Sequence, residues 1–427
     1  MSNKRKLLII GSSSGSKEFV IEAKRQGIYT IVTDYLDVKD SEAKQIANEY
    51  WMISTGEVDV LEAKCREKKV DALISGASAF NISVMMELCS RLNLPCYCNR
   101  EAWEYTVNKR KFKDICSSVG VPVAKDYYVS IEPTKEELEK IKYPVVVKPI
   151  DLSANRGMSY CYNENELLEA CEKARAISKS ETIIVERMLN GVEYGAHYAL
   201  ADGNANMFDF VAMIHQPEYP SNCYSVTTNN TNNLNKFLLE INQKMIAALN
   251  KMGVKDGIAW IEMILDEDGS FYVLEMGYRI SGDMIALVQK NTCNFNVYKW
   301  LLDIAMGKKH SKVDLPVAQK KLYERCGCCY ILWSREDGTV TSIEGLEKIV
   351  HYPTINVQTI LKVGSKVKKH QYLVVITFDV DNCEQMCEMI EKINKILYIY
   401  NETENNVIYF NDFNHLYKLD SEGRLEK

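Results

Sequence analysis

The chain has 427 residues, which is long enough for two or three domains with substantial cores. Its composition is 46% hydrophobic and 26% charged, as in globular proteins. A net charge of −6 and a pI near 5.7 exclude the basic surface that nucleic acids or anionic membranes require, and favour small-molecule chemistry.

Neither a targeting signal nor a disulfide framework is expected. The segment MSNKRKLLII has four consecutive apolar residues before Gly11, too few for a signal peptide, and no window could span a membrane, so we expect a cytoplasmic protein. The 14 cysteines are scattered, which favours reduced thiols. Cys326, Cys328 and Cys329 lack a second Cys or His pair, so we expect buried thiols rather than a zinc site.

The first 98 residues alternate between strand and helix patterns. A buried strand over 6–10 runs into Gly11, a helical pattern follows, and a second strand ends at Asp34; helices are also predicted over 58–68 and 81–92. This pattern predicts a parallel sheet covered on both faces. Asp34 fits the ribose-binding acid of an NAD-binding Rossmann domain, but the G-x-G-x-x-G glycines are missing. We favour a Rossmann-like domain with another role and keep NAD binding as the alternative.

Two lysines of the next region are candidate anion ligands. Lys109 lies in a helical region over 99–120, whose lysines could also form a solvated face. Lys148 ends the apolar strand of YPVVVKPI, where its ammonium group would point beyond the strand. The loop at 151–159 is not a Walker A motif, but it offers hydroxyl groups, one guanidinium and backbone amides as phosphate donors. Its candidate residues are Ser153, Arg156, Gly157 and Ser159.

The chain then returns to strands. Asn163 is predicted to cap a helix that ends near Ile177, and the strand after it enters a turn at Asn190, with Glu193 just beyond. A strand over 207–214 leads to the segment 215–233, which has little periodicity and is predicted to be a long functional loop. His197 and His215 could act as acid or base, but such histidines are more often structural, and we leave them out of the site.

A β-hairpin is predicted over 257–283, with its turn at 266–269. If the turn closes on Glu267 and Asp268, Glu262 lies opposite Val273, and Glu262 and Glu275 are diagonal neighbours on one face. Diagonal neighbours are roughly 7 to 8 Å apart, which a divalent ion bridged by two carboxylates and a phosphate oxygen can span. A solvated face with two unrelated acids explains the spacing equally well.

The two faces of this hairpin differ in polarity. The face without the acids is wholly apolar and is predicted to enter a core; it carries Ala259, Ile261, Met263, Leu265, Tyr272, Leu274 and Met276. The acidic face is also rich in apolar residues, namely Trp260, Ile264, Phe271 and Val273. The two acids are therefore expected in a covered cleft, where they would raise each other's pKa unless a cation neutralised them.

Three domains are predicted: a Rossmann-like domain over 1–98, a central domain over 99–308 with a lid subdomain at about 123–190, and a small α+β cap over 309–427. A helix over 298–306 closes the central domain. The cap shows short strands at 330–334, 338–345 and 373–380 and an amphipathic helix over 384–396.

This order of parts, α/β and α+β in class, resembles the ATP-grasp superfamily, and in outline its L-amino acid ligases. The specific matches run from about Lys109 to Asp283. The resemblance implies that Lys109, eleven positions before Gly120 of a G-V-P turn, and Lys148 contact ATP phosphates, and that Ser153, Arg156 and Gly157 lie in a lid over them. It further implies that the main chain from Glu186 to Leu189 holds adenine, that Glu193 grips the ribose, and that Glu262 and Glu275 hold Mg²⁺ or Mn²⁺.

One position departs from the family pattern. The commonest ending, E-x-N-x-R, reads here Glu275-Met-Gly277-Tyr-Arg279, so the asparagine that would be a further metal ligand is a glycine. A second metal ion would then depend on water or on Glu275 alone. Arg279 offers a charged fork for a carboxylate or acyl phosphate, or else forms a structural ion pair.

The resemblance implies an ATP-dependent ligase that activates a carboxylate as an acyl phosphate for capture by an amine. Arg279 and Lys148 are the predicted catalytic residues, and Ser281, Gly282 and Asp283 are substrate candidates. A carboxylase that activates bicarbonate, with Asp283 as base, and a nucleotide-binding protein without ligase activity are the alternatives. The expected partners are a small-molecule carboxylate and amine, with no nucleic acid or membrane; a homodimer is left open.

Overall fold

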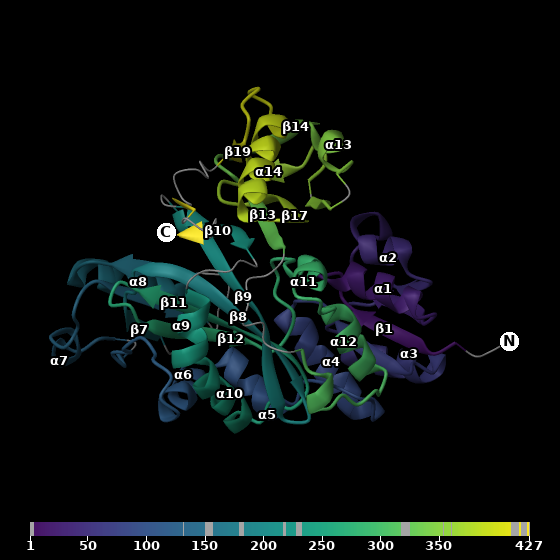
Figure 1. The fold of residues 1–427 in the computed structure, drawn as a ribbon, viewed down its shortest axis with the longest axis horizontal. Coiled ribbons are helices and arrows are strands. Elements are labelled where there is room, and N and C mark those ends of the chain that lie inside the picture. The colour runs from purple at the N-terminus through teal and green to yellow at the C-terminus, as the bar shows by residue number, and fades with distance from the viewer. Residues whose placement is uncertain are drawn as a thin grey trace.

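In the computed structural model of the chain, the described residues are 4–130, 132–149, 157–178, 183–216, 219–227, 233–316, 325–352, 354–359, 361–410, 418–419 and 425–426. Figure 1 shows three lobes arranged around a long antiparallel sheet, and this mixture confirms the predicted fold class.

The first lobe is a parallel sheet covered by helices, as predicted. Its strand order is β3-β2-β1-β4, with β1 Lys6–Ile10, β2 Tyr29–Thr33, β3 Glu49–Trp51 and β4 Ala72–Ser75. The helices are α1 Ser16–Arg25, α2 Glu42–Ile46, α3 Val58–Lys68 and α4 Ala79–Leu92. Asp34 is buried and its carboxylate lies 2.7 Å from the Nζ atom of Lys44. This internal ion pair gives the acid a structural partner, which argues against the NAD alternative.

Two helices replace the single helical region predicted over 99–120. They are α5 Arg100–Val107 and α6 Lys109–Ser118, and the chain breaks between them at Asn108. The Asn108 side chain accepts a hydrogen bond from the backbone N–H of Lys111 at 3.1 Å, so it caps the second helix. Lys109 is therefore the first residue of α6, at the helix end that the break fixes.

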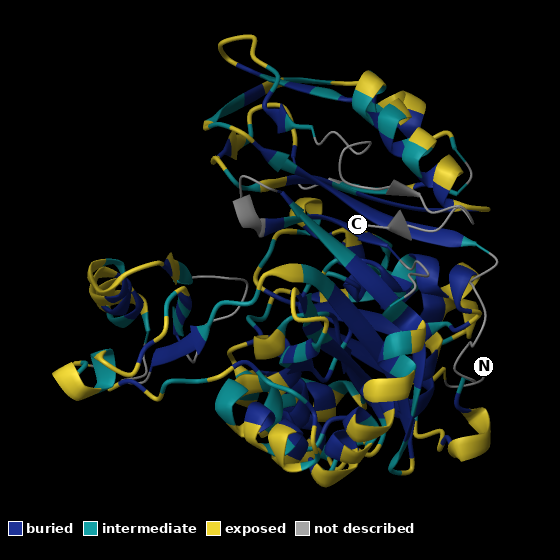
Figure 2. Cartoon of the chain, turned by 60° about the vertical axis from the view of Figure 1, so that its left-hand side comes forward, coloured by how far each residue is buried: buried dark blue, intermediate teal, exposed yellow. Residues whose placement is uncertain are grey.

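The second lobe contains a three-stranded sheet with its own apolar core. Its strands β5 Val145–Pro149, β6 Ser159–Cys161 and β7 Ile183–Arg187 are covered by α8 Glu164–Ile177, with the short helix α7 Lys135–Leu138 nearby. Asn163 caps α8 as predicted, since its side chain accepts from the N–H of Glu166. Figure 2 shows this lobe standing to one side of the main body, with exposed residues on its outer surface.

The central sheet has nine strands, eight of them in the order β12-β11-β8-β9-β10-β13-β17-β15. Its strands are β8 Gly191–Ala201, β9 Asn204–Gln216, β10 Tyr219–Thr227, β11 Gly257–Asp266, β12 Phe271–Gly277, β13 Cys326–Ser334, β15 Asn356–Thr359, β17 Tyr372–Val380 and β19 Ile408–Tyr409. The predicted long loop at 215–233 is thus wrong in part, because β10 pairs with β9 and β13 there. The sequence Cys-Tyr-Ser-Val-Thr at 223–227 is rich in strand-favouring residues, a signal that the missing periodicity obscured.

Helices cover this sheet. The chain between β10 and the hairpin forms two helices, α9 Asn233–Glu240 and α10 Asn242–Lys251, and α11 Ala286–Thr292 and α12 Val297–Ala305 follow the hairpin. Helix α12 packs against α1 and β4, so it ties the first lobe to the sheet.

The third lobe lies over the end of the sheet (Figure 1). It adds β14 Gly338–Glu344, β16 Lys366–Val367, β18 Tyr398–Asn401, α13 Leu346–Ile349 and α14 Cys383–Ile396. Strands β13, β15 and β17 of this part belong to the central sheet, which therefore continues past residue 308. The domain limits given above remain a prediction.

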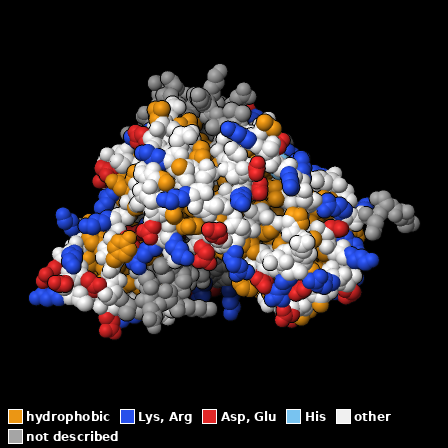
Figure 3. Space-filling model, turned by 90° about the horizontal axis from the view of Figure 1, so that it is seen from below, with side chains coloured by type: hydrophobic (Ala, Val, Ile, Leu, Met, Phe, Trp, Pro, Cys, Tyr) orange, Lys and Arg blue, Asp and Glu red, His pale blue; other side chains and the backbone are white. Residues whose placement is uncertain are grey.

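None of the 14 cysteines, all of which lie in the described part of the chain, forms a disulfide, and Cys326, Cys328 and Cys329 are buried along β13, as expected of strand-lining thiols. None of the described helices combines the length and apolarity needed to cross a bilayer. On the face drawn in Figure 3, positive and negative side chains are interspersed, in keeping with the absence of a basic footprint in the composition.

Candidate active site

A cavity of about 480 Å³ lies where the central sheet, the second lobe and the loops after β4 and β12 meet. Most of the predicted site residues line it. Its charged lining residues are Lys109, Lys148, Glu186, Arg187, Glu193, Glu262, Glu275, Arg279 and Asp283. Leu189, Ser281 and Gly282 also line it, together with apolar residues such as Ala124, Val146, Ile264 and Leu274.

The two acids of the hairpin share one face, as predicted, but the predicted register was wrong. Glu262 lies directly opposite Glu275, and Trp260 lies opposite Gly277. The register shifts after this pair, so that Met263 lies opposite Val273. Leu274 is therefore the extra residue of a β-bulge, and the two acids are direct rather than diagonal neighbours.

The bulge also changes which side chains enter the core. Phe271 and Val273 were predicted on the acidic face, yet both are buried in the main hydrophobic cluster. Leu274 was predicted in the core, yet it lines the cavity. A contact from outside the hairpin accompanies the bulge: the N–H of Val273 donates to the carbonyl of Pro122 at 3.0 Å, which binds the G-V-P turn to the edge of β12.

One acid of the pair forms an ion pair with a lysine. Lys109 Nζ lies 2.5 Å from a carboxylate oxygen of Glu275. Burial opposes the charge of Glu275, but Lys109, Lys148 and Arg279 together reverse this effect, so the pKa of Glu275 lies below its usual value. Burial and the negative charge of Glu275 hold the pKa of Glu262 well above the normal range.

These electrostatics test whether a divalent cation fits the pair. A carboxylate whose pKa is raised by burial and by a neighbouring negative charge lacks a positive partner that would favour its charged form. Oxygen donors facing each other across a strand pair are the ligands that Mg²⁺ and Mn²⁺ prefer. Glu262 and Glu275 therefore fit such an ion. Among the described residues, no cluster of three or more His, Cys, Asp or Glu side chains offers a complete cage, so phosphate and water would complete the coordination.

A second charged cluster lies at the strand end that carries Lys148. Lys148 Nζ lies 2.7 Å from one oxygen of Glu186, and Lys113 Nζ contacts the other. Burial opposes ionisation of Glu186, but the two lysines reverse its effect and lower the pKa of Glu186 to about 2. Burial and repulsion by Lys148 lower the pKa of Lys113 to about 8, against the attraction of Glu186.

Lys113 was missed by the sequence interpretation, which singled out only Lys109 on this helix. The signal was present: the two lysines are four residues apart and so share one face of α6. Glu186 was predicted to hold adenine through its main chain. The structure gives its side chain a further role, because its carboxylate binds two lysines.

The remaining predicted nucleotide contacts are distributed unevenly. Glu193 lines the cavity with His215 Nε2 at 3.0 Å from its carboxylate. Gly157 has φ +74°, and a Cβ there would lie 2.4 Å from Ile177, but it does not line the cavity. Ser153 and Arg156 lie outside the described residues. His197 is buried against Gln289 at 2.9 Å, in agreement with a structural role.

The substrate candidates lie at the end of β12. The Arg279 guanidinium stacks on the Trp260 ring, 5.2 Å from its centre, and donates to the carbonyl of Ile280 at 2.8 Å. Asp283 accepts hydrogen bonds from Ser281 Oγ at 2.6 Å and from the N–H of Ile285 at 3.1 Å. Asp283 therefore caps its turn, although the residue also lines the cavity.

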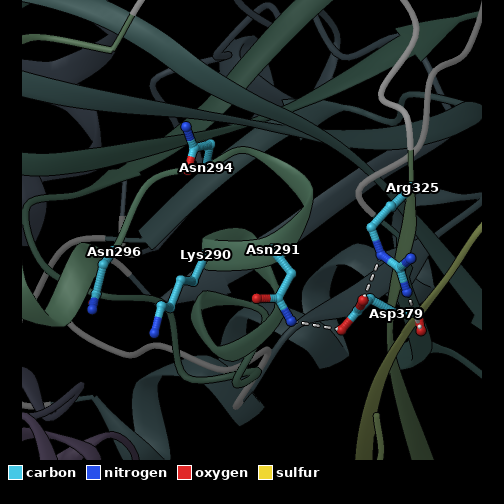
Figure 4. A pocket seen from close by; sticks show the side chains of 6 residues that line it. All are labelled: Lys290, Asn291, Asn294, Asn296, Arg325 and Asp379. Atoms are coloured by element: carbon cyan, nitrogen blue, oxygen red, sulfur yellow. Dashed lines mark hydrogen bonds and ion pairs between the residues drawn. The ribbon is translucent and has the colours of Figure 1, made fainter.

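A separate cavity of about 560 Å³ holds none of the predicted site residues (Figure 4). It is lined by Lys290, Asn291, Asn294, Asn296, Arg325 and Asp379. Asp379 accepts from Arg325 at 2.7 Å and from Asn291 at 2.9 Å, so its charge is satisfied within the fold.

The fold and the cavity define an α/β protein in which a small three-stranded sheet and a large antiparallel sheet enclose a site of paired acids and lysines. Comparison with known proteins indicates which family has this kind of fold and site. The family model described as "Carbamoyl-phosphate synthase L chain, ATP binding domain" matches residues 108–313. Over this part of the chain, the match supports the predicted resemblance to the ATP-grasp superfamily.

Individual relatives are distant. The chain is 28% identical over 192 residues to a formate-dependent phosphoribosylglycinamide formyltransferase of Prochlorococcus marinus (strain AS9601), a match that covers 44% of this chain and 48% of that protein. This match therefore spans about half the length of that relative.

Two solved structures share its fold. The L-amino acid ligase from Bacillus licheniformis matches with a TM-score of 0.75 at 19% identity. The superposition covers 94% of this chain and 100% of the ligase chain. The biotin carboxylase domain of the Hydrogenobacter thermophilus 2-oxoglutarate carboxylase, solved with MgADP and bicarbonate, has a TM-score of 0.74 at 17% identity and covers 93% and 91%.

Proposed function

We propose that this protein is an ATP-dependent ligase that activates a small carboxylate as an acyl phosphate and joins it to an amine. The observation that carries the proposal is that Glu262 and Glu275 lie directly opposite each other. Lys109 forms an ion pair with Glu275, and Lys148 lines the same cavity. The relationship to a formyltransferase that acts on a glycinamide and the shared fold of an L-amino acid ligase support it.

We assign each residue to a part of the nucleotide largely by its charge. Lys109 and Lys148 would contact the phosphates, and Glu262 and Glu275 would hold Mg²⁺ or Mn²⁺, which when bound neutralises phosphate charge. The main chain from Glu186 to Leu189 would hold adenine. Glu193 would accept from the ribose hydroxyl groups, and the lid around Gly157 would cover the phosphates.

The reaction needs positioning more than covalent help from the protein. A carboxylate oxygen of the substrate attacks the γ-phosphorus, the bond to ADP breaks, and an acyl phosphate forms. The amine then attacks the acyl carbon, loses a proton, and phosphate leaves. Arg279 would bind the carboxylate and later the acyl phosphate through its planar fork, and Lys148 would stabilise the transferring phosphoryl group. Ser281, Gly282 and Asp283 would complete the substrate side.

Bicarbonate is the alternative carboxylate. Its supporting observation is that Asp283, four residues after Arg279, lines the cavity and could act as the base. The hydrogen bonds from Ser281 and Ile285 weaken this alternative, because they give Asp283 a turn-capping role.

An ADP-release screen of the purified protein with ATP and Mg²⁺ tests the proposal. Single amino acids, pairs of amino acids, small carboxylates and bicarbonate are added in turn. We expect release that depends on a carboxylate and increases with an amine, and that Lys148→Met abolishes. Stimulation by bicarbonate alone would favour the carboxylase. ATP binding without release under any condition would leave a nucleotide-binding protein without ligase activity.

A further inference from the structure

Trp260 and Gly277 form an unusual pair beside the two acids. They are directly opposed in the β11–β12 ladder, two residues along each strand from Glu262 and Glu275, and therefore lie on the same face. A Cβ built on Gly277 would lie 2.1 Å from Cε2 and 2.5 Å from Nε1 of the Trp260 indole. The ring therefore lies across the glycine, and position 277 cannot carry a side chain while the indole is there.

The indole also carries an unused donor. Trp260 is only 8% exposed, and its Nε1 atom is buried without a hydrogen-bond partner among the described residues. The ring lines the cavity that holds the two acids. Leaving a buried N–H unpaired costs free energy, so an acceptor that reached this edge of the ring would be favoured.

The indole N–H can bind only a hydrogen-bond acceptor, and this limits the kind of ligand. An indole N–H donates and cannot accept, so it cannot bind a metal ion, and glycine adds no oxygen atom at this rung. The guanidinium of Arg279, stacked on the same ring, is also only a donor. Along this face of the hairpin, Glu262 and Glu275 offer oxygen ligands for a cation, whereas the neighbouring Trp260 and Arg279 offer hydrogen-bond donors for an anion.

We propose that Trp260 is a specificity-determining residue with two linked effects. Its ring restricts the divalent cation to the rung of Glu262 and Glu275, so that one ion binds with each nucleotide. Its Nε1–H, together with Arg279, binds an anionic oxygen of the group being activated, a carboxylate or the phosphate released from it. The inference rests on the proposed function, since it assumes that nucleotide and cation occupy this cavity.

Metal counting tests the first effect. Mn²⁺ is titrated against protein saturated with ADP, and free Mn²⁺ is measured by electron paramagnetic resonance. We expect one bound ion per ADP in the wild type and in Trp260→Phe, which keeps a ring over Gly277. The double variant Trp260→Ala/Gly277→Asn frees the space and adds an amide oxygen, and we expect two ions. Two ions in the wild type, or one in the double variant, would overturn this part.

Anion binding tests the second effect. The dissociation constant of inorganic phosphate is measured by calorimetry in the presence of MgADP. Trp260→Phe removes the N–H and should weaken phosphate binding about tenfold, while ADP affinity stays unchanged. Equal phosphate affinity in the two proteins would overturn the role of the N–H. A wild type that binds no MgADP would instead overturn the proposed function, and this inference with it.

Discussion

The cluster of Glu186, Lys113 and Lys148 has one negative and two positive groups, all largely buried. A single carboxylate thus holds two ammonium groups, and the cluster keeps an excess positive charge inside the fold. Buried charge is tolerated where a partner is present, so an incoming phosphate is the natural second partner for Lys148. Glu186 acts as a positioning residue, because it orients the lysines rather than contacting the reacting atoms.

Replacing Glu186 by glutamine should be strongly destabilising. The variant keeps the side-chain volume but leaves two buried ammonium groups without a negative partner, which costs about 3 kcal/mol in the free energy of unfolding. Urea unfolding followed by circular dichroism measures the loss. Glu62→Gln, at an exposed ion pair with Arg66, is the matched control and should leave stability within error. An equal loss in both variants would contradict the role assigned to Glu186.

The same carboxylate predicts an acid-sensitive component of stability. The pKa of Glu186 is lowered from 4.5 to about 2 in the folded protein, so between these values the unfolded chain binds the proton more readily. The stabilisation is present above about pH 4.5 and is lost as the pH falls towards 2. The stability difference between wild type and Glu186→Gln should therefore shrink when urea unfolding is repeated between about pH 7 and pH 3. A constant difference would contradict this assignment.

At the scale of elements, the hairpin shows what the sequence could and could not predict. Alternation along two strands was enough to place Glu262 and Glu275 on one face, because residues two apart share a face whatever the partner strand does. The register depended on the bulge at Leu274. That bulge accompanies a hydrogen bond to Pro122, about 150 residues away in the chain, and no local pattern reports such a contact.

Helix α6 carries the other part of the site, and its start is fixed by Asn108. We expect Asn108→Ala to lower the free energy of unfolding by about 1 kcal/mol, because the N–H of Lys111 loses its cap. Since Lys109 is the first residue of the helix, the same change should raise the KM for ATP. Asn108→Ser keeps a capping oxygen and should restore both values. Equal defects in the serine and alanine variants would show that the cap is not the cause.

Across the whole molecule, the parts with strong local signals were predictable. The alternating strand and helix patterns of the first lobe predicted the parallel sheet, and Asn163 predicted the start of α8. The continuation of one sheet from β8 through β10 to β13 and β17 was not predictable, because antiparallel partners far apart in the chain share no local pattern. Trp260 was noted only as an apolar residue; its position over Gly277 required the register.

The two lobes that enclose the cavity should be stabilised together by a ligand. Lys148 and Glu186 belong to the small sheet, while Glu262 and Glu275 belong to the central sheet, so ATP with Mg²⁺ would bridge them. At about a hundred times its Kd, such a ligand adds roughly 2.7 kcal/mol to stability. Thermal denaturation should show a higher Tm with MgATP than with ATP and EDTA, and Glu275→Gln should remove the difference because it loses a metal ligand. NAD should have no effect; a rise in Tm with NAD, or one that EDTA leaves intact, would contradict a metal-dependent nucleotide site between the lobes.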